Sequence, residues 1–233
     1  MNRFLRSFLF CAAVAVAPAG FAADAAATSP AAAVLAAFSD AQLSDGLKSG
    51  LGTALETAMG KLVQPGALQV SPPPALAKIE AASGNAAQGD GLTSSLNVAV
   101  AKVAPQAAEL MRATFKDVKL VDAKAALLNA PAGGTQYLKK TMTPALREKL
   151  LPLVKQAVTA AGVEEKANRL LASAGPLASL AGGKSLANID GYVCDQVINQ
   201  SFKLMSKEEG AIRANPSLLE NPLARKIFSL IKK

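Results

Sequence analysis

The feature that most constrains the fold is a run of apolar residues at every fourth position from residue 43 to residue 59, followed by one more at residue 62. An α-helix turns once in about 3.6 residues, so this spacing places all of these side chains on one face of a helix. No segment of the chain alternates apolar and polar residues as a half-buried strand does. The sequence therefore predicts a protein built from helices. The apolar face consists of Leu43, Leu47, Leu51, Leu55, Met59 and Leu62.

Glycines and prolines divide the rest of the chain into further helical stretches. They predict an all-α fold, a single irregular bundle of about eight helices with no substantial sheet and no repeat of fixed period. Residues 68–70 and 118–121 are the only segments that could form short strands. After the first helix, which ends at Pro65 and Gly66, we expect helices over residues 74–83, 96–116, 122–128, 143–161, 163–174, 189–214 and 223–231.

Local signals mark some of the helix ends. Ser39 and Gln42 have the spacing of a capping box, in which their side chains satisfy free N–H groups of the first turn. Thr143 followed by Pro144 is a favourable helix start, because a proline at the first position has no N–H group to leave unpaired. Pro105 interrupts its helix, either as a kink or as the start of a second helix.

Gly46 and Gly50 lie on a common face of the first helix, in a row with two alanines. A glycine inside a helix costs about 1 kcal/mol relative to alanine. Two glycines on one face therefore predict that another helix approaches closely there.

The first residues of the chain have the layout of a secretory signal peptide. Arg3 and Arg6 give a positive start, residues 8–21 are uncharged and almost entirely apolar, and small residues follow. The apolar run is shorter than the ~20 residues of a transmembrane helix, although a retained anchor is the alternative. We expect export to the periplasm and no membrane-spanning segment after cleavage. The expected divisions are residues 1–22 as signal peptide, residues 23–38 as an alanine-rich leader or short helix, and residues 39–233 as the helical domain.

Composition excludes several classes of function. Histidine is absent, which removes the commonest general base and the commonest metal ligand, and we expect neither a metal nor a cofactor. Aromatic residues make up 4% of the chain and there is no tryptophan, so we expect no nucleic-acid partner. The net charge of +8 becomes +6 without Arg3 and Arg6, and it serves solubility or contact with anionic envelope lipids.

Two local features resemble reactive sites. Residues 178–185 nearly match the phosphate-binding P-loop, but Gly175 and Pro176 precede them where a buried strand is needed. We interpret this segment as an interhelical loop and expect no nucleotide. Cys194 has no histidine to activate it and is predicted to be a small buried apolar residue.

The most informative polar residues belong to the helix expected over residues 189–214. Glu209 and Arg213 are four positions apart and predict an ion pair, either on the surface or within a buried network that joins this helix to its neighbours. Asp190 lies in the first turn, where we expect it to cap free N–H groups.

Glu208 points about 100° away from Glu209 around the same helix. We expect it to be partly buried and paired with a basic residue such as Lys139, Lys140 or Arg147.

Several segments together resemble a known family. In the C-terminal part of the chain they are residues 189–195 (IDGYVCD), 208–216 (EEGAIRANP) and 223–230. Earlier in the chain they are residues 46–48 (GLK), 104–105, 135–138, Thr141 and 151–155. In order and spacing they resemble the bacterial family called domain of unknown function 4197, from about residue 43 to the end. Departures include residues 63–66, where the family has Asp-Gly-Phe, and Cys194, where threonine is common. The resemblance implies an exported helical protein and supplies no mechanism.

Three functional hypotheses follow. The sequence favours a non-enzymatic envelope protein that binds a partner or ligand. The second is a carrier of an apolar, lipid-like ligand between helices, suggested by the 51% hydrophobic content and the glycine and alanine rows. The third is a histidine-free enzyme that uses carboxylates and tyrosine. The candidate ligand- or partner-binding residues are Tyr137, Arg147, Asp190, Tyr192, Glu208, Glu209 and Arg213, with no catalytic residue assigned.

Overall fold

The computed structural model describes residues 30–82, 91–129, 132–175 and 188–231. These residues form nine α-helices and one short 3-10 helix, with no strand, which confirms the predicted all-α bundle. The elements are α1 (Pro30–Leu35), α2 (Asp40–Leu62), α3 (Pro74–Ala82), α4 (Leu92–Lys116), α5 (Ala123–Leu128), α6 (Gly133–Ala160), α7 (Val163–Ser173), α9 (Ile189–Ala214), η4 (Pro216–Leu218) and α10 (Pro222–Leu230).

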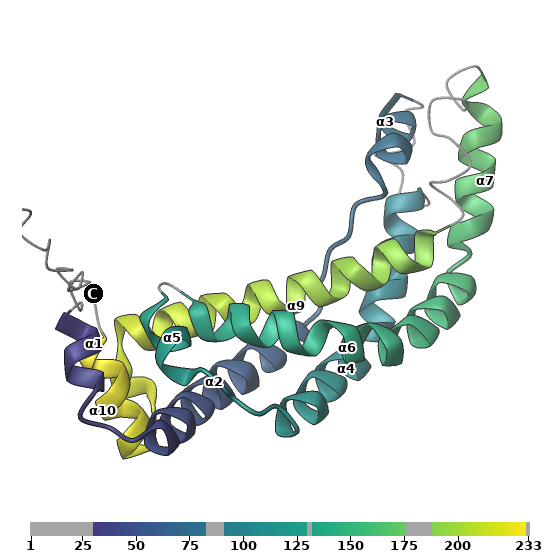
Figure 1. Ribbon diagram of the computed structural model, residues 1–233. Coiled ribbons are helices and arrows are strands. Elements are labelled where there is room, and N and C mark those ends of the chain that lie inside the picture. Colours follow the sequence, from purple (N-terminus) through teal and green to yellow (C-terminus); the bar gives the residue numbers. More distant parts are fainter. Residues whose placement is uncertain (1–29, 83–90, 130–131, 176–187, 232–233) are drawn as a thin grey trace, which may run out of the picture.

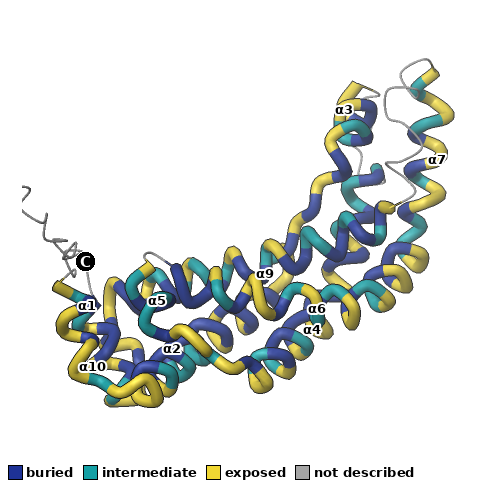
Figure 2. The backbone as a smooth tube through the Cα atoms, viewed as in Figure 1, coloured by how far each residue is buried: buried dark blue, intermediate teal, exposed yellow. Residues whose placement is uncertain are grey.

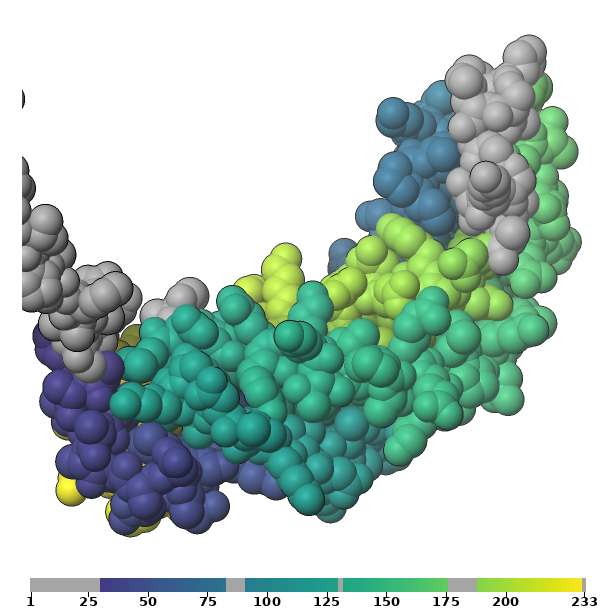
Figure 3. All heavy atoms as spheres, viewed as in Figure 1, coloured from purple at the N-terminus to yellow at the C-terminus, as the bar shows by residue number. Residues whose placement is uncertain are grey.

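The helices form a bent molecule with a long body and a short arm (Figure 1). The body contains α2, α6, α9 and most of α4. At one end α3 and α7 rise away from the body, and at the other end α1 and α10 lie together beside the start of α2. The bend gives the molecule a concave edge, along which α9 runs (Figure 3).

The core follows the periodicity of the sequence. All six residues of the predicted apolar face of α2 are buried. Helix α9 packs most extensively against α2 and α6, and buried positions recur along its length (Figure 2). The observed α9 has the predicted bounds.

The start of α2 has the expected cap. Ser39 N–H donates to Gln42 Oε1 at 2.9 Å, and Gln42 N–H donates to Ser39 Oγ at 3.2 Å. Both bonds of the capping box are therefore present.

The two glycines of α2 lie where the sequence predicts a close neighbour, and that neighbour is α10. A Cβ atom added to Gly46 would lie 2.5 Å from Ile227 Cδ1, and one added to Gly50 would lie 2.5 Å from Phe228 Cε2. Real Cβ atoms essentially never come that close. The glycines thus allow two large apolar side chains of α10 to rest directly on the α2 backbone.

Helix α6 does not begin where the sequence predicts. It starts at Gly133 and continues through Pro144, so Thr143 is an interior residue whose hydroxyl donates to the carbonyl of Lys139 at 2.6 Å. The prediction was wrong because the true start is capped from another helix. The carboxylate of Glu209 accepts the free N–H groups at this end of α6, a tertiary contact that no local pattern contains.

Pro105 likewise lies inside one continuous helix, α4, and does not begin a second one. The absence of a strand around residue 70 also has a local reason. Val70 N–H donates to Asn97 Oδ1 at 2.8 Å, and the side-chain amide of Gln200 bonds both N–H and C=O of Gln69. Side chains of α4 and α9 therefore satisfy this extended backbone without a partner strand.

Three parts of the sequence prediction lie outside the described residues: the signal peptide over residues 1–22, the first part (23–29) of the alanine-rich leader, and the P-loop-like residues 178–185. Among the helices that the structure describes, none combines the length and the apolar character needed to cross a membrane.

Candidate functional site

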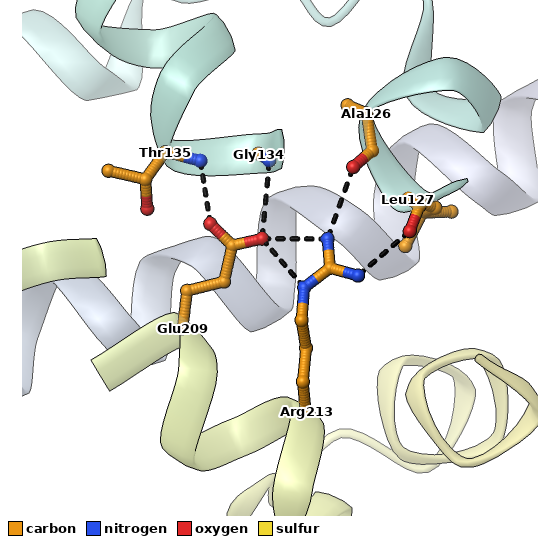
Figure 4. A network of polar contacts seen from close by, with 6 residues as sticks. All are labelled: Ala126, Leu127, Gly134, Thr135, Glu209 and Arg213. Atoms are coloured by element: carbon orange, nitrogen blue, oxygen red, sulfur yellow. Dashed lines mark hydrogen bonds and ion pairs between the residues drawn. The ribbon is translucent and has the colours of Figure 1, made fainter. Parts of the chain in front are cut away.

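The ion pair predicted between Glu209 and Arg213 is buried. Arg213 Nε and Nη2 donate to Glu209 Oε1 at 2.9 and 2.8 Å, and the two side chains are 8% and 1% exposed. The same carboxylate accepts the N–H groups of Gly134 at 3.2 Å and Thr135 at 2.6 Å (Figure 4). Its negative charge therefore sits at the positive end of the α6 dipole.

Arg213 also donates hydrogen bonds to carbonyl groups at the carboxyl end of α5. Its Nη1 donates to Leu127 O at 2.8 Å and its Nη2 donates to Ala126 O at 3.1 Å, at the carboxyl end of α5 (Figure 4). The guanidinium also lies 5.8 Å from the centre of the Phe228 ring of α10. One ion pair on α9 thus ties together the end of α5, the start of α6 and α10.

Glu208 is partly buried and paired, as expected, but its partner is a different residue. Its carboxylate lies 2.6 Å from Lys61 Nζ at the end of α2, with the lysine 56% exposed and the glutamate 13% exposed. The expected partners Lys139, Lys140 and Arg147 were wrong, because Glu208 faces α2 rather than α6. The choice depends on which helix packs on that side of α9, and the sequence alone does not specify it.

Arg147 pairs instead with Asp195 of α9, at 2.8 Å between Nε and Oδ1. Both side chains are close to half exposed, and the carboxylate raises the pKa of the guanidinium. This pair is a second polar contact between α6 and α9.

The two candidate tyrosines each hold a loop against a helix. Tyr137 Oη donates to Lys119 O at 2.9 Å and accepts the N–H of Val121 at 3.3 Å. Tyr192 Oη donates to Ser71 O at 3.1 Å, in the extended segment before α3, and burial raises the pKa of its phenol. Both hydroxyl groups are used within the protein.

Asp190 lies in the first turn of α9 but does not cap the helix as expected. Its Oδ1 atom is buried and has no hydrogen-bond partner. Burial raises the pKa of this carboxyl group, nearby Glu164 adds to the rise, and Lys155 opposes it.

The seven candidate residues do not form one site. Only Glu209 and Arg213 bond to each other, and Tyr192 and Glu208 are separated by about 24 Å along α9, at 1.5 Å per residue. Cys194 is fully buried, as predicted, and burial raises the pKa of its thiol to about 11. Within the described residues, no group of three or more carboxylates and thiols is placed to hold a metal ion.

The structure instead reveals an open groove between α6 and α9. It comprises an inner hollow of about 210 Å³, lined by both helices, and an outer hollow of about 460 Å³ beside it on α6. The two hollows share Gln136 and Lys139, and we call them together the α6–α9 groove. The inner hollow is lined by Thr135, Gln136, Lys139, Asn199, Phe202, Lys203 and Ser206, and the outer one by Gln136, Lys139, Lys140, Thr143 and Pro144.

The α6–α9 groove is basic. Among the described residues that line it there are three lysines and no carboxylate. The lysines are exposed, and none forms an ion pair within the described part of the chain. The hydroxyl of Thr135 is buried and has no hydrogen-bond partner. Buried polar groups without a partner are rare in proteins and call for an explanation such as a bound water or ion.

Sequence reasoning missed this groove. The lysine at 139 was considered only as a partner for Glu208, and Lys203 and Thr135 were not singled out. Lys139 and Lys203 are far apart in the chain and meet only because α6 and α9 pack side by side. No signal within either helix predicts that juxtaposition.

Comparison with known protein families gave a match over most of the chain. A family model described as "Protein of unknown function (DUF4197)" matches residues 37–229. Neither the search of curated proteins nor the search of solved structures returned a match.

Proposed function

Because the chain belongs to the family described as "Protein of unknown function (DUF4197)", which assigns no activity, we propose a function from the geometry: a non-enzymatic envelope protein that binds a partner or ligand in the α6–α9 groove. The observation that carries this proposal is the groove itself. It joins two hollows, and three lysines and several amide and hydroxyl groups line it. Its lysines, amides and hydroxyl groups offer hydrogen bonds and positive charge that the described protein does not use.

The proposed location is the periplasm. The support is the sequence pattern of residues 1–22, with a positive start followed by an apolar run and small residues. A protein in that compartment meets anionic headgroups and other envelope proteins, and a basic groove suits both.

Two sets of contacts weaken the support for the alternative functions. The glycine face of α2, which suggested space for an apolar ligand, is filled by Ile227 and Phe228. The carboxylates of a histidine-free enzyme, Glu208 and Glu209, are held in ion pairs, and Tyr192 lies far from both.

The test is native mass spectrometry of the protein purified from the cell envelope. We expect the wild type to carry an additional mass and Ser206→Trp to lack it, because an indole at position 206 would fill the inner hollow. Ala211→Trp is the matched control, since Ala211 is an exposed residue of the same helix that does not line the groove.

Equal additional mass on the wild type and the Ser206→Trp protein would place the binding elsewhere. A wild type that never carries additional mass and pulls down no envelope component in a Ser206-dependent manner would contradict the proposal altogether.

A further inference from the structure

The groove is most informative at its inner hollow, which is lined by one lysine from each of the two helices. Lys139 comes from α6 and Lys203 from α9, and both line the same space of about 210 Å³. A space of this size is below the 300–1,000 Å³ typical of drug-sized ligands. It suits a small group carrying concentrated charge.

Between the lysines stand neutral hydrogen-bonding groups. Gln136, Asn199 and Ser206 contribute amide and hydroxyl groups to the lining, and Phe202 adds an apolar surface. Amides and hydroxyls both donate and accept, so they can adapt to the oxygens of an anion. The nearest carboxylates along the two helices are engaged, Glu208 with Lys61 and Glu209 with Arg213.

The hydroxyl of Thr135 supplies the second observation. Thr135 is 3% exposed and lines the inner hollow, and its Oγ1 atom has no hydrogen-bond partner. Its own backbone N–H is already used by Glu209, so the side chain is the group left free. The oxygen itself is buried below the lining, so it marks a polar group left without a partner next to the hollow and is not a direct contact for a ligand there.

We infer that the inner hollow binds a phosphate-type oxyanion, either free phosphate or the phosphate of an anionic lipid headgroup. Lys139 and Lys203 balance its charge, and side-chain amide and hydroxyl groups of the lining donate hydrogen bonds to its oxygens. This inference rests on the proposed function, since it names the ligand chemistry of the same groove.

Calorimetric titration with inorganic phosphate tests the chemistry, using the protein purified from the envelope. The doubly substituted Lys139→Gln/Lys203→Gln protein should bind phosphate at least about tenfold more weakly than the wild type, because it loses two charge-assisted contacts. Binding should also weaken as salt is added.

The matched control is Lys149→Gln/Lys207→Gln. It removes the same total charge from exposed positions of the same two helices that do not line the groove. Its phosphate affinity should equal that of the wild type, and melting temperatures should establish that all variants are folded.

Sedimentation with vesicles distinguishes the two sources of phosphate. Vesicles of phosphatidylcholine and phosphatidylglycerol in equal parts are compared with vesicles of phosphatidylcholine alone. Binding to the anionic vesicles that is lost in Lys139→Gln/Lys203→Gln and kept in the control would identify a lipid headgroup, even if free phosphate binds too weakly to measure.

Two results would overturn the inference. One is phosphate or vesicle binding that the groove variants leave unchanged, or that the control loses equally. The other is no binding of either probe by the wild type. In both cases, native mass spectrometry of the wild type and of Ser206→Trp still tests separately whether the groove binds a ligand of other chemistry.

Discussion

Replacing Glu209 by glutamine perturbs the buried network at its centre while keeping the size of the side chain. In the wild type Oε1 accepts from Gly134 N–H and from two nitrogens of Arg213, and Oε2 accepts from Thr135 N–H. A glutamine has one oxygen and one NH₂ group in these places. Whichever way the amide turns, its NH₂ group faces a donor, either Thr135 N–H or the Arg213 guanidinium.

The magnitude follows from burial. The two side chains are 1% and 8% exposed, so Glu209→Gln leaves the charge of Arg213 buried without a counter-ion. Breaking a buried ion pair from one side costs about 3–5 kcal/mol, out of a total stability of about 5–15 kcal/mol for a typical domain. We therefore expect the substitution to remove a large share of the free energy of unfolding.

The neighbouring residue provides the matched control. Glu208→Gln makes the same chemical change one position away, in an ion pair whose lysine is 56% exposed. Such a pair contributes about 0–1 kcal/mol. The assay is urea unfolding of both variants and the wild type, with the midpoint and slope fitted for each.

A loss for Glu209→Gln below about 1 kcal/mol, or equal to that of Glu208→Gln, would refute the reasoning. It would mean that the network at the start of α6 is solvated or dispensable. The role assigned to Glu209 in setting where α6 begins would then fail as well.

Three further predictions concern single residues. Gly50→Ala should lower the melting temperature, because the added Cβ atom would meet the Phe228 ring. Gly60→Ala is the control in the same helix; its Cβ atom would have no neighbour within 4 Å, so it should stabilise the helix by about 0.5–1 kcal/mol. Equal effects of the two substitutions in thermal melts would contradict the close packing at Gly50. Cys194 should react with a thiol reagent only after unfolding in urea, because it is fully buried and its thiol pKa is about 11; prompt reaction of the native protein would disprove this. Asp190→Asn should raise the free energy of unfolding at neutral pH, because burial raises the pKa of this carboxyl group and disfavours its ionised form. This gain should shrink as the pH falls towards the ordinary pKa of 3.8. Urea unfolding at several pH values is the measurement, and a gain that stays constant or grows as the pH falls would contradict the prediction.

The parts of the fold that the sequence predicts well are those encoded within a single helix. The apolar face of α2, its capping box and the bounds of α9 depend on periodicity and on nearest neighbours, and all three are confirmed. The glycines of α2 predicted a close neighbour correctly, because a glycine inside a helix lowers the stability of the helix and close packing accounts for its presence there.

The parts that the sequence does not predict depend on contacts between helices. Thr143 and Pro144 form a favourable local start, but a carboxylate of α9 caps Gly134 and Thr135 and starts α6 earlier. The buried pair of Glu209 and Arg213 was one of two predicted outcomes. Spacing of four residues brings such a pair together equally well on the surface or in the interior.

The same distinction separates the buried network from the groove that we propose binds a ligand. Glu209 and Arg213 cannot turn to a ligand without releasing the ends of α5 and α6, because their donors and acceptors already hold those backbone groups. Binding there would cost stability. Lys139 and Lys203 form no ion pair within the described part of the chain, so an anion placed between them breaks no such contact. The α6–α9 groove is therefore where binding energy can be gained without loosening the bundle, and the residues that decide it are the two lysines that the helix-by-helix pattern did not distinguish from ordinary surface charge.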